Sequence, residues 1–133
     1  MRKLCELMDL SGRVALVTGG AGFIGRAICQ ALSENGCQLV VMDRASQRIE
    51  WQQLVGELSS DITYVEVDLE DEAAVRAAVI DIKDKHHRLD VLINNAAYVA
   101  SNSLEGWATD FSQQDLSTWR RAIEVNLTSC LVT

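Results

Sequence analysis

Four glycines, Gly19, Gly20, Gly22 and Gly25, have the types and spacing to bind the phosphate groups of a nucleotide. They follow an apolar run, residues 14–17, and precede a helix-like segment. Gly19 can adopt backbone angles closed to other residues, and missing Cβ atoms at Gly20 and Gly22 would let backbone N–H groups approach a pyrophosphate. Gly25 would let helix and strand pack closely, with the anion at the positive end of the helix. The alternative is a strand–turn–helix that uses glycine only for its turn.

An acidic residue, Asp43, follows the next apolar run, 18 residues after Gly25. A carboxylate at the end of a second strand accepts hydrogen bonds from the ribose hydroxyls of adenosine and would repel a 2′-phosphate. The neighbouring Arg44 argues the other way, because its guanidinium could pair with that phosphate. We therefore expect NAD as the cofactor, with NADP less favoured. The alternative is that Asp43 is a solvated carboxylate that only ends a strand.

Further polar residues follow the next two apolar runs. Asp68 could accept a hydrogen bond from the adenine amino group while Leu69 packs against the ring. Asp68 could also be the N-cap of the following helix, and its two oxygens allow both roles. Asn94 and Asn95 enter a position expected to be buried, so their amides need partners. Neighbouring strands or a cofactor would supply them.

The elements that must position these residues can be predicted from the hydrophobic pattern. The predicted strands are residues 14–17, 37–42, 62–67 and 89–93. Helices are expected after the glycine cluster, over residues 70–87 and from about residue 115 onward, and residues 45–58 are helix-permissive. This alternation predicts an α/β fold of the Rossmann type, a doubly wound parallel sheet with strand order 3-2-1-4. The glycines, Asp43, Asp68 and the two asparagines would then meet at the carboxyl ends of the strands.

Helical spacing also predicts which side of each helix is buried. The face of the first helix is Ile24, Ala27, Ile28, Ala31 and Leu32, and that of the second is Ala74, Val75, Ala78, Val79 and Ile82. In the last helix Trp119, Ile123, Asn126 and Leu127 recur at helical spacing. Trp51, Trp107 and Trp119 are expected in core or interface packing, and His86 and His87 are expected to be solvated.

Composition restricts the classes of function. The chain has 133 residues with 12 Lys+Arg against 19 Asp+Glu, a formal net charge of -7, so nucleic acid is not an expected partner. No apolar run approaches the length of a membrane span, and Glu6 and Asp9 interrupt any signal-peptide core. The four cysteines have no metal-ligand spacing. We expect no metal site, no membrane contact, and a cytoplasmic protein with reduced thiols, two of them in the core.

Together these pieces resemble the amino-terminal half of a short-chain dehydrogenase/reductase. The matching segments run in family order: Thr18–Gly25 (TGGAGFIG), Asp43, Asp68–Leu69, Asn94–Ala97 (NNAA) and Val125–Leu127 (VNL). The resemblance implies a Rossmann fold that binds NAD(P), and hydride transfer between nicotinamide and an alcohol or carbonyl substrate. It implies Gly19, Gly22, Phe23, Ile24 and Gly25 around the pyrophosphate. It also implies Asp68 and Leu69 at adenine, and Asn95, Ala96 and Ala97 beside the adenosine half.

The chain departs from the family pattern in its glycine spacing. The spacing TGxxGxxG resembles the extended subfamily of sugar-nucleotide epimerases and dehydratases, whereas the NNAA and VNL segments resemble the ordinary subfamily. This mixture suggests a dehydrogenase-like enzyme with a small-molecule substrate that is related to sugars. Ala97 stands where the family usually has glycine.

A second departure concerns catalysis. In the family, a Tyr, a Lys four residues later and an upstream Ser transfer the proton. The tyrosines here are Tyr64 and Tyr98, and neither has a lysine four residues on. The resemblance assigns Asn126 to the family's helix-bound Asn, whose backbone positions a water for that lysine. We expect residues 1–133 to be a NAD(P)-binding Rossmann domain, incomplete at its C-terminal side and truncated before the catalytic Tyr/Lys region, hence inactive alone.

The rival hypothesis is a non-catalytic dinucleotide-binding or interaction module. In that case the last helix and the fourth strand would be a surface for a partner. Helices in this position commonly form subunit interfaces in the family, so a homo-oligomer through the last helix is expected under either hypothesis.

Overall fold

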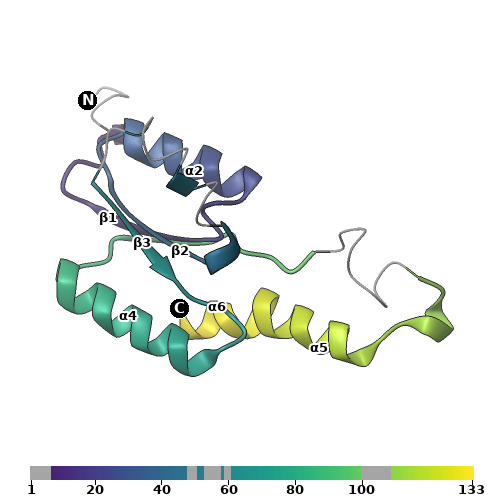
Figure 1. Ribbon diagram of the computed structural model, residues 1–133. Coiled ribbons are helices and arrows are strands. Elements are labelled where there is room, and N and C mark those ends of the chain that lie inside the picture. Colours follow the sequence, from purple (N-terminus) through teal and green to yellow (C-terminus); the bar gives the residue numbers. More distant parts are fainter. Residues whose placement is uncertain (1–6, 48–50, 53–57, 59–60, 100–108) are drawn as a thin grey trace.

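Short runs of aliphatic and β-branched residues form the strands of one parallel sheet (Figure 1). The computed structural model describes residues 7–47, 51–52, 58, 61–99 and 109–133. The strands are β1 (Val14–Thr18), β2 (Gln38–Asp43), β3 (Ile62–Glu66) and β4 (Val91–Asn94). They lie in the order β3-β2-β1-β4, which confirms the predicted topology. The direction of winding reverses at β1, and in such sheets ligands bind at the carboxyl ends of the strands beside this point.

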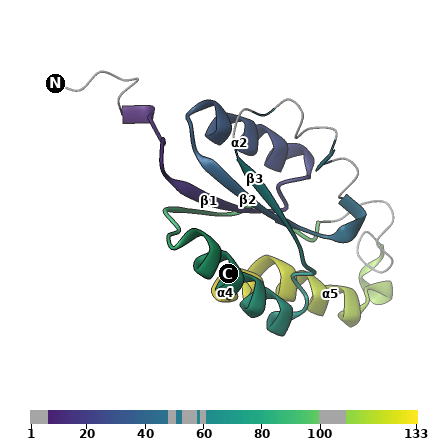
Figure 2. The ribbon, with the colours of Figure 1, turned by 60° about the vertical axis from the view of Figure 1, so that its left-hand side comes forward.

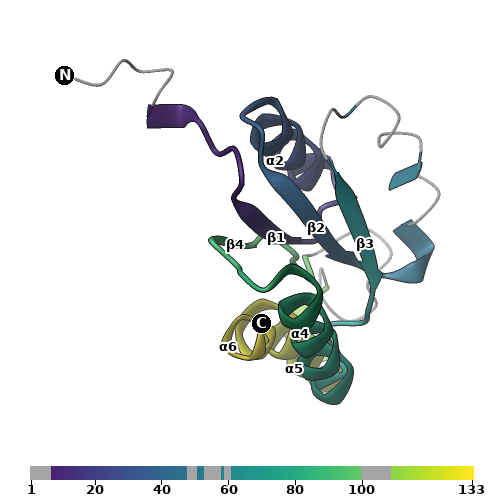
Figure 3. The ribbon, with the colours of Figure 1, turned by 90° about the vertical axis from the view of Figure 1, so that its left-hand side faces the viewer.

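Helices cover both faces of the sheet, as Figures 2 and 3 show. The helices are α2 (Phe23–Glu34), α4 (Glu72–His86), α5 (Leu116–Ile123) and α6 (Ser129–Val132). Helix α2 lies on one face, and α4, α5 and α6 lie on the other. Single 3-10 turns occur at Ala45–Gln47 and Phe111–Gln113. Among the described residues, no helix has the length and apolar character needed to cross a bilayer.

The side chains of the two central strands alternate between two cores. Leu16 and Val40 belong to the core under α4, whereas Val17 and Val41 belong to the core under α2. All four are fully buried. Because a strand has a side-chain period of two, a continuous apolar run is needed when both faces are covered. Coverage of both faces of the sheet therefore explains the uninterrupted apolar runs of these two strands.

Helix α2 buries a different side from the one predicted. Its buried residues are Gly25, Cys29 and Ser33, while Ala27 and Ala31 are exposed. Ile24 is also exposed, and Ile28 and Leu32 only flank the core. Small side chains line the contact because they let the helix approach the sheet closely. Cys29 and Cys37 are both buried, as expected for two of the thiols.

Helix α4 follows the prediction on its buried side and departs from it at its start. Val75, Ala78 and Ile82 are buried, and Ala74 and Val79 pack partly against them. The N-cap is Asp71, whose side chain accepts a hydrogen bond from the backbone N–H of Ala74. The alternative role that the sequence allowed for Asp68, as the N-cap of this helix, is therefore wrong. At the other end His87 takes a left-handed conformation with φ 56° and ends the helix.

The last helical segment is interrupted by a π-helical stretch, Glu124–Thr128, between α5 and α6. Its buried side consists of the small or medium residues Thr118, Ala122, Val125 and Ser129. The large apolar residues are on the exposed side: Leu116, Trp119, Ile123 and Leu127. Trp119 is 57% exposed, so it is not a core residue. The sequence pattern contained no signal for the extra residue in this helical turn.

The remaining aromatic and histidine predictions have mixed outcomes. Trp51 is buried and packs against Tyr64, with ring centroids 5.9 Å apart, whereas Trp107 lies outside the described residues. His87 is exposed, but His86 is half-buried and its Nδ1 lies 3.4 Å from the side-chain oxygen of Gln38. The expectation that His86 is solvated is wrong, because the end of α4 packs against the start of β2.

Candidate functional site

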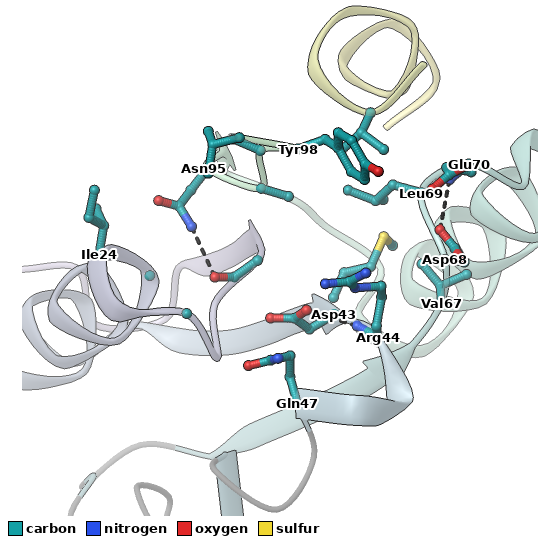
Figure 4. A pocket seen from close by; sticks show the side chains of 18 of the residues that line it. Ile24, Asp43, Arg44, Gln47, Val67, Asp68, Leu69, Glu70, Asn95 and Tyr98 are labelled. Atoms are coloured by element: carbon teal, nitrogen blue, oxygen red, sulfur yellow. Dashed lines mark hydrogen bonds between the residues drawn. The ribbon is translucent and has the colours of Figure 1, made fainter. Parts of the chain in front are cut away.

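A cavity of about 410 Å³ opens at the carboxyl ends of the strands (Figure 4). This volume is in the range of small-molecule sites. Twelve of its lining residues were predicted from sequence as cofactor-binding: Gly19, Gly22, Phe23, Ile24, Gly25, Asp43, Arg44, Asp68, Leu69, Asn95, Ala96 and Ala97. The remaining lining residues were not predicted: Met42, Gln47, Val67, Glu70, Tyr98, Val99 and Val125. Residues far apart in the chain therefore converge on one cavity.

The glycine turn is shaped by the absence of side chains. Gly19 has φ +64°, and a Cβ there would lie 2.7 Å from the Cα of Ala96. A Cβ on Gly25 would overlap the carbonyl oxygen of Gly19. The turn between β1 and α2 therefore needs glycine at both positions, and it brings the N-terminal end of α2 to the edge of the cavity. The free N–H groups of a helix N-terminus form an anion site.

Gly20 has a different role from the predicted one. It is buried, and a Cβ there would lie 2.8 Å from Val41 and 3.2 Å from the Sγ of Cys29. The missing side chain therefore lets the turn pack on the core instead of opening a path for a phosphate. Gly22, which is the N-cap of α2, does line the cavity.

The Asp43 carboxylate is held at the base of the glycine turn. Its two oxygens accept hydrogen bonds from the backbone N–H groups of Ala21, at 3.0 Å, and of Arg44, at 2.8 Å. Asp43 is only 9% exposed, so it is not a solvated strand end. A carboxylate has about four acceptor positions, so both oxygens retain acceptor capacity for a ligand. Burial, with a smaller contribution from the Asp43 charge, raises the pKa of the nearby Cys29 thiol to about 12.

Asn95 joins the end of β4 to the glycine turn. Its side-chain NH2 donates to the carbonyl oxygens of Thr18, at 3.1 Å, and Gly19, at 3.0 Å. In return the Thr18 hydroxyl accepts from the backbone N–H groups of Asn95 and Ala96. These bonds supply the partners that the Asn95 amide needs. Asn94 is exposed at the end of β4, so the expectation of a buried amide fails there.

The segment after β3 forms another wall of the cavity. Asp68 accepts a hydrogen bond from the backbone N–H of Glu70 at 3.0 Å, shown as a dashed line in Figure 4. Val67 and Leu69, on either side of Asp68, are almost fully buried in the core beneath the cavity. The carboxylate is thereby held at the cavity while its neighbours anchor the turn.

Asn126 does not line the cavity, but its side chain holds the backbone of Tyr98, which does. The side-chain oxygen of Asn126 accepts from the backbone N–H of Tyr98 at 2.7 Å, and its NH2 donates to the Tyr98 carbonyl at 3.1 Å. Both backbone groups of Tyr98 are thus held from within the π-helical stretch. This side-chain contact was not foreseen, because it joins positions 28 residues apart that no local pattern connects.

The chain is similar to known proteins over most of its length. The sequence profile described as short chain dehydrogenase matches residues 13–133. The chain belongs to the short-chain dehydrogenase family. An uncharacterized oxidoreductase of Thermotoga maritima is 36% identical over 120 residues, which cover 90% of this chain and 44% of that protein. The chain thus spans about half the length of the curated relatives it matches.

Solved structures of short-chain dehydrogenases share the fold. A metagenomic short-chain oxidoreductase in complex with NADP has a TM-score of 0.78 at 28% identity, over 93% of this chain and 54% of that one. A 3-ketoacyl-(acyl-carrier-protein) reductase from Brucella melitensis complexed with NADH has a TM-score of 0.76 at 25% identity, over 92% of this chain and 47% of that one. These relatives bind nicotinamide cofactors of both phosphorylation states. Within the described residues no group of His, Cys, Asp and Glu could hold a metal ion.

Proposed function

We propose that the chain is the cofactor-binding part of a short-chain oxidoreductase and that it binds NAD in the cavity at the strand ends. The observation that carries this proposal is the convergence of twelve predicted residues on one cavity of ligand size. The glycine turn supports it independently, because Gly19 and Gly25 cannot carry a side chain without displacing the backbone around them. A cradle of this kind fits a pyrophosphate.

In this proposal each part of the dinucleotide has its own partners. The pyrophosphate lies at the N-terminal end of α2, beside Gly22. The ribose hydroxyls of adenosine donate to Asp43, whose oxygens are already oriented by two backbone N–H groups. The adenine lies between Leu69 and Ala96, with its amino group donating to Asp68. The bound cofactor would supply the hydride acceptor or donor, and the residues of this chain hold it in place.

The preference for NAD over NADP rests on Asp43. A buried carboxylate beside the ribose would repel a 2′-phosphate, and hydrogen bonds from two backbone N–H groups hold the Asp43 carboxylate in its orientation. Arg44 is exposed next to it and is the one feature of this wall that favours NADP. The relatives do not decide the matter, since one was solved with NADP and another with NADH.

Proton transfer would use groups outside this chain. Tyr64 and Tyr98 are the only tyrosines of the sequence. The hydroxyl of Tyr64 donates to the Arg44 carbonyl, and Tyr98 faces Arg121. Neither has a lysine four residues later. We therefore propose that the full-length enzyme acts on an alcohol or carbonyl compound with its Tyr/Lys pair in its other half. In that enzyme the Asn126 backbone would position a water for the lysine. The TGxxGxxG spacing favours a sugar-related substrate.

Calorimetric titration with NADH and NADPH tests the cofactor assignment. Wild type should bind NADH more tightly, and Asp43→Ala should reduce that preference by about tenfold, because a carboxylate–hydroxyl bond and a charge repulsion are both removed. Asp81→Ala removes an exposed carboxylate on α4, away from the cavity lining, and should change neither affinity. The proposal fails if a folded sample binds neither nucleotide or binds NADPH more tightly.

A homo-oligomer through the last helix is part of the proposal. The exposed apolar row on α5 and the π-helical stretch, Leu116, Trp119, Ile123 and Leu127, is the surface it would use. This row is also what favours the rival function, an interaction module. Trp119→Glu should lower the oligomeric state measured by sedimentation, whereas a monomeric wild type over the micromolar range would contradict self-association. Turnover by the full-length chain would rule out the interaction module as its only role.

A further inference from the structure

We propose that Arg121 is a positioning residue of the nucleotide site, which links Glu70 and Tyr98 across the end of the cavity where adenine would lie. The inference rests on the proposed function. It concerns residues that neither the family motifs nor the sequence patterns single out.

The first contact is a forked ion pair with Glu70. The Nε of Arg121 lies 3.1 Å and 2.9 Å from the two Glu70 carboxylate oxygens, and an Nη lies 2.8 Å from one of them. The Glu70 side chain is 27% exposed and that of Arg121 is 49% exposed. A planar guanidinium that faces a carboxylate in this way fixes orientation as well as distance, which a lysine ammonium does not.

The second contact is with the ring of Tyr98. The guanidinium carbon of Arg121 lies 4.9 Å from the centroid of that ring, within the range of a cation–π interaction. Since Asn126 holds the Tyr98 backbone, α5 and the π-helical stretch hold this residue at both its main chain and its side chain. Figure 4 shows Tyr98 beside Leu69 and Glu70 at one end of the cavity.

These two walls follow strands that are not paired with each other. Glu70 follows β3 and Tyr98 follows β4, and these are the two edge strands of the sheet. Strands β2 and β1 lie between them, so β3 and β4 share no direct ladder of hydrogen bonds. Arg121 contacts both, and the link therefore comes from a helix on one face of the sheet. It also pairs the negative charge of Glu70, a residue that lines the cavity, with a positive charge.

We expect the link to affect which base the site binds. The turn that contains Asp68 and Glu70 is held in one position, so Asp68 can select the adenine amino group over the carbonyl oxygen that guanine carries there. The link should therefore contribute to discrimination between adenine and guanine nucleotides, beyond affinity alone. A residue that only stabilised the fold would change the affinity for both bases by the same factor.

The experiment compares ADP and GDP as probes by calorimetry for wild type, Arg121→Ala and Arg120→Ala. Arg120 is the matched control: its removal changes the charge equally on the same helix, and Arg120 is exposed and outside the cavity lining. Arg121→Ala should weaken ADP binding about fivefold and lower the ratio of the GDP to the ADP dissociation constant by about threefold, effects of the size of one partly exposed ion pair. Arg120→Ala should change each by less than about twofold.

Glu70→Gln provides a second route if Arg121→Ala does not fold. It removes the ion pair from the opposite wall and should lower the GDP/ADP ratio similarly. In the double variant, the effect of Arg121→Ala should shrink to less than half of its value in wild type, because the two residues act through each other.

The outcomes separate the two proposals. If wild type binds ADP but Arg121→Ala matches Arg120→Ala, or weakens ADP and GDP equally, the positioning role is refuted and the proposed function stands. If folded wild type binds no adenine nucleotide, the proposed function fails and the role of Arg121 fails with it.

Discussion

Replacing Gly19 by alanine should destabilise the fold through two separable effects. Gly19 has φ +64°, a conformation that residues with a Cβ adopt only under strain. The added Cβ would also lie 2.7 Å from the Cα of Ala96 and 3.0 Å from its backbone nitrogen. These are backbone atoms just after β4, and the Ala96 N–H donates to the Thr18 hydroxyl, so they cannot turn away as a flexible side chain could.

The magnitude can be worked out with Gly12 as a reference. Gly12 has φ +73° and nothing within 4 Å of an added Cβ, so Gly12→Ala isolates the conformational term. That term is about 1–2 kcal/mol of strain, offset by about 0.4–1 kcal/mol from the stiffer unfolded chain. A net loss of about 1 kcal/mol is expected at Gly12. Crowding against Ala96 adds about 1–3 kcal/mol at Gly19, which gives about 2–4 kcal/mol there.

Urea unfolding of wild type and of the two variants measures the difference directly. Gly19→Ala should have the lower midpoint with an unchanged slope, and it should bind NADH at least about tenfold more weakly, because the turn must move away from Ala96. Equal losses of stability for Gly12→Ala and Gly19→Ala would refute the reasoning, since the approach to Ala96 would then carry no energetic cost.

Three further predictions concern the core, the pH dependence and the thiols. Ile82→Ala, at a residue 4% exposed, should lower the free energy of unfolding by about 2–5 kcal/mol, whereas Ile80→Ala, at 58% exposed, should change it by less than about 0.5 kcal/mol in the same urea titration. The pKa of His86 is lowered by burial and then by the charge of Lys85, against an opposing effect of Asp61. The unfolded chain therefore binds the proton more readily, and stability should fall as the pH drops below about 6.5, with a shallower fall in His86→Gln when unfolding is measured from pH 5 to 7.5. Cys29 is fully buried, and its pKa is raised to about 12, whereas Cys130 is exposed. Mass spectrometry after iodoacetamide treatment at pH 8 should therefore find Cys130 alkylated in the native protein and Cys29 alkylated only after unfolding. Equal labelling of the two thiols would contradict the buried position of Cys29.

The order of the strands could be predicted because each of its determinants is local. The apolar run at residues 14–17, the glycines after it and Asp43 after the next run are each recognisable within a few residues. Because strands that alternate with helices form parallel sheets, their carboxyl ends meet at one edge. The predicted cofactor residues therefore line one cavity although no pair of them was known to be in contact.

The buried sides of two helices were decided by the tertiary structure. Helical spacing put Ile24 of α2 and Trp119 of α5 in the apolar pattern, but the buried residues are smaller ones, such as Cys29 on α2 and Ala122 on α5. Close approach of a helix to a sheet favours small side chains at the contact. A periodic pattern does not say how close the helix will come, so the large apolar residues of α5 are exposed.

Sequence by itself determined the fold class, the strand order and twelve of the residues that line the cavity at the strand ends, since these depend on local conformation and on the period of the apolar residues. Tertiary structure alone decided which carboxylate caps α4, that Asn126 acts through Tyr98, and that Arg121 links Glu70 to Tyr98. Arg121 and Glu70 are 51 residues apart and follow no common pattern. Such contacts depend on where the chain places each backbone, and charged residues of the same type elsewhere on the surface look identical in the sequence.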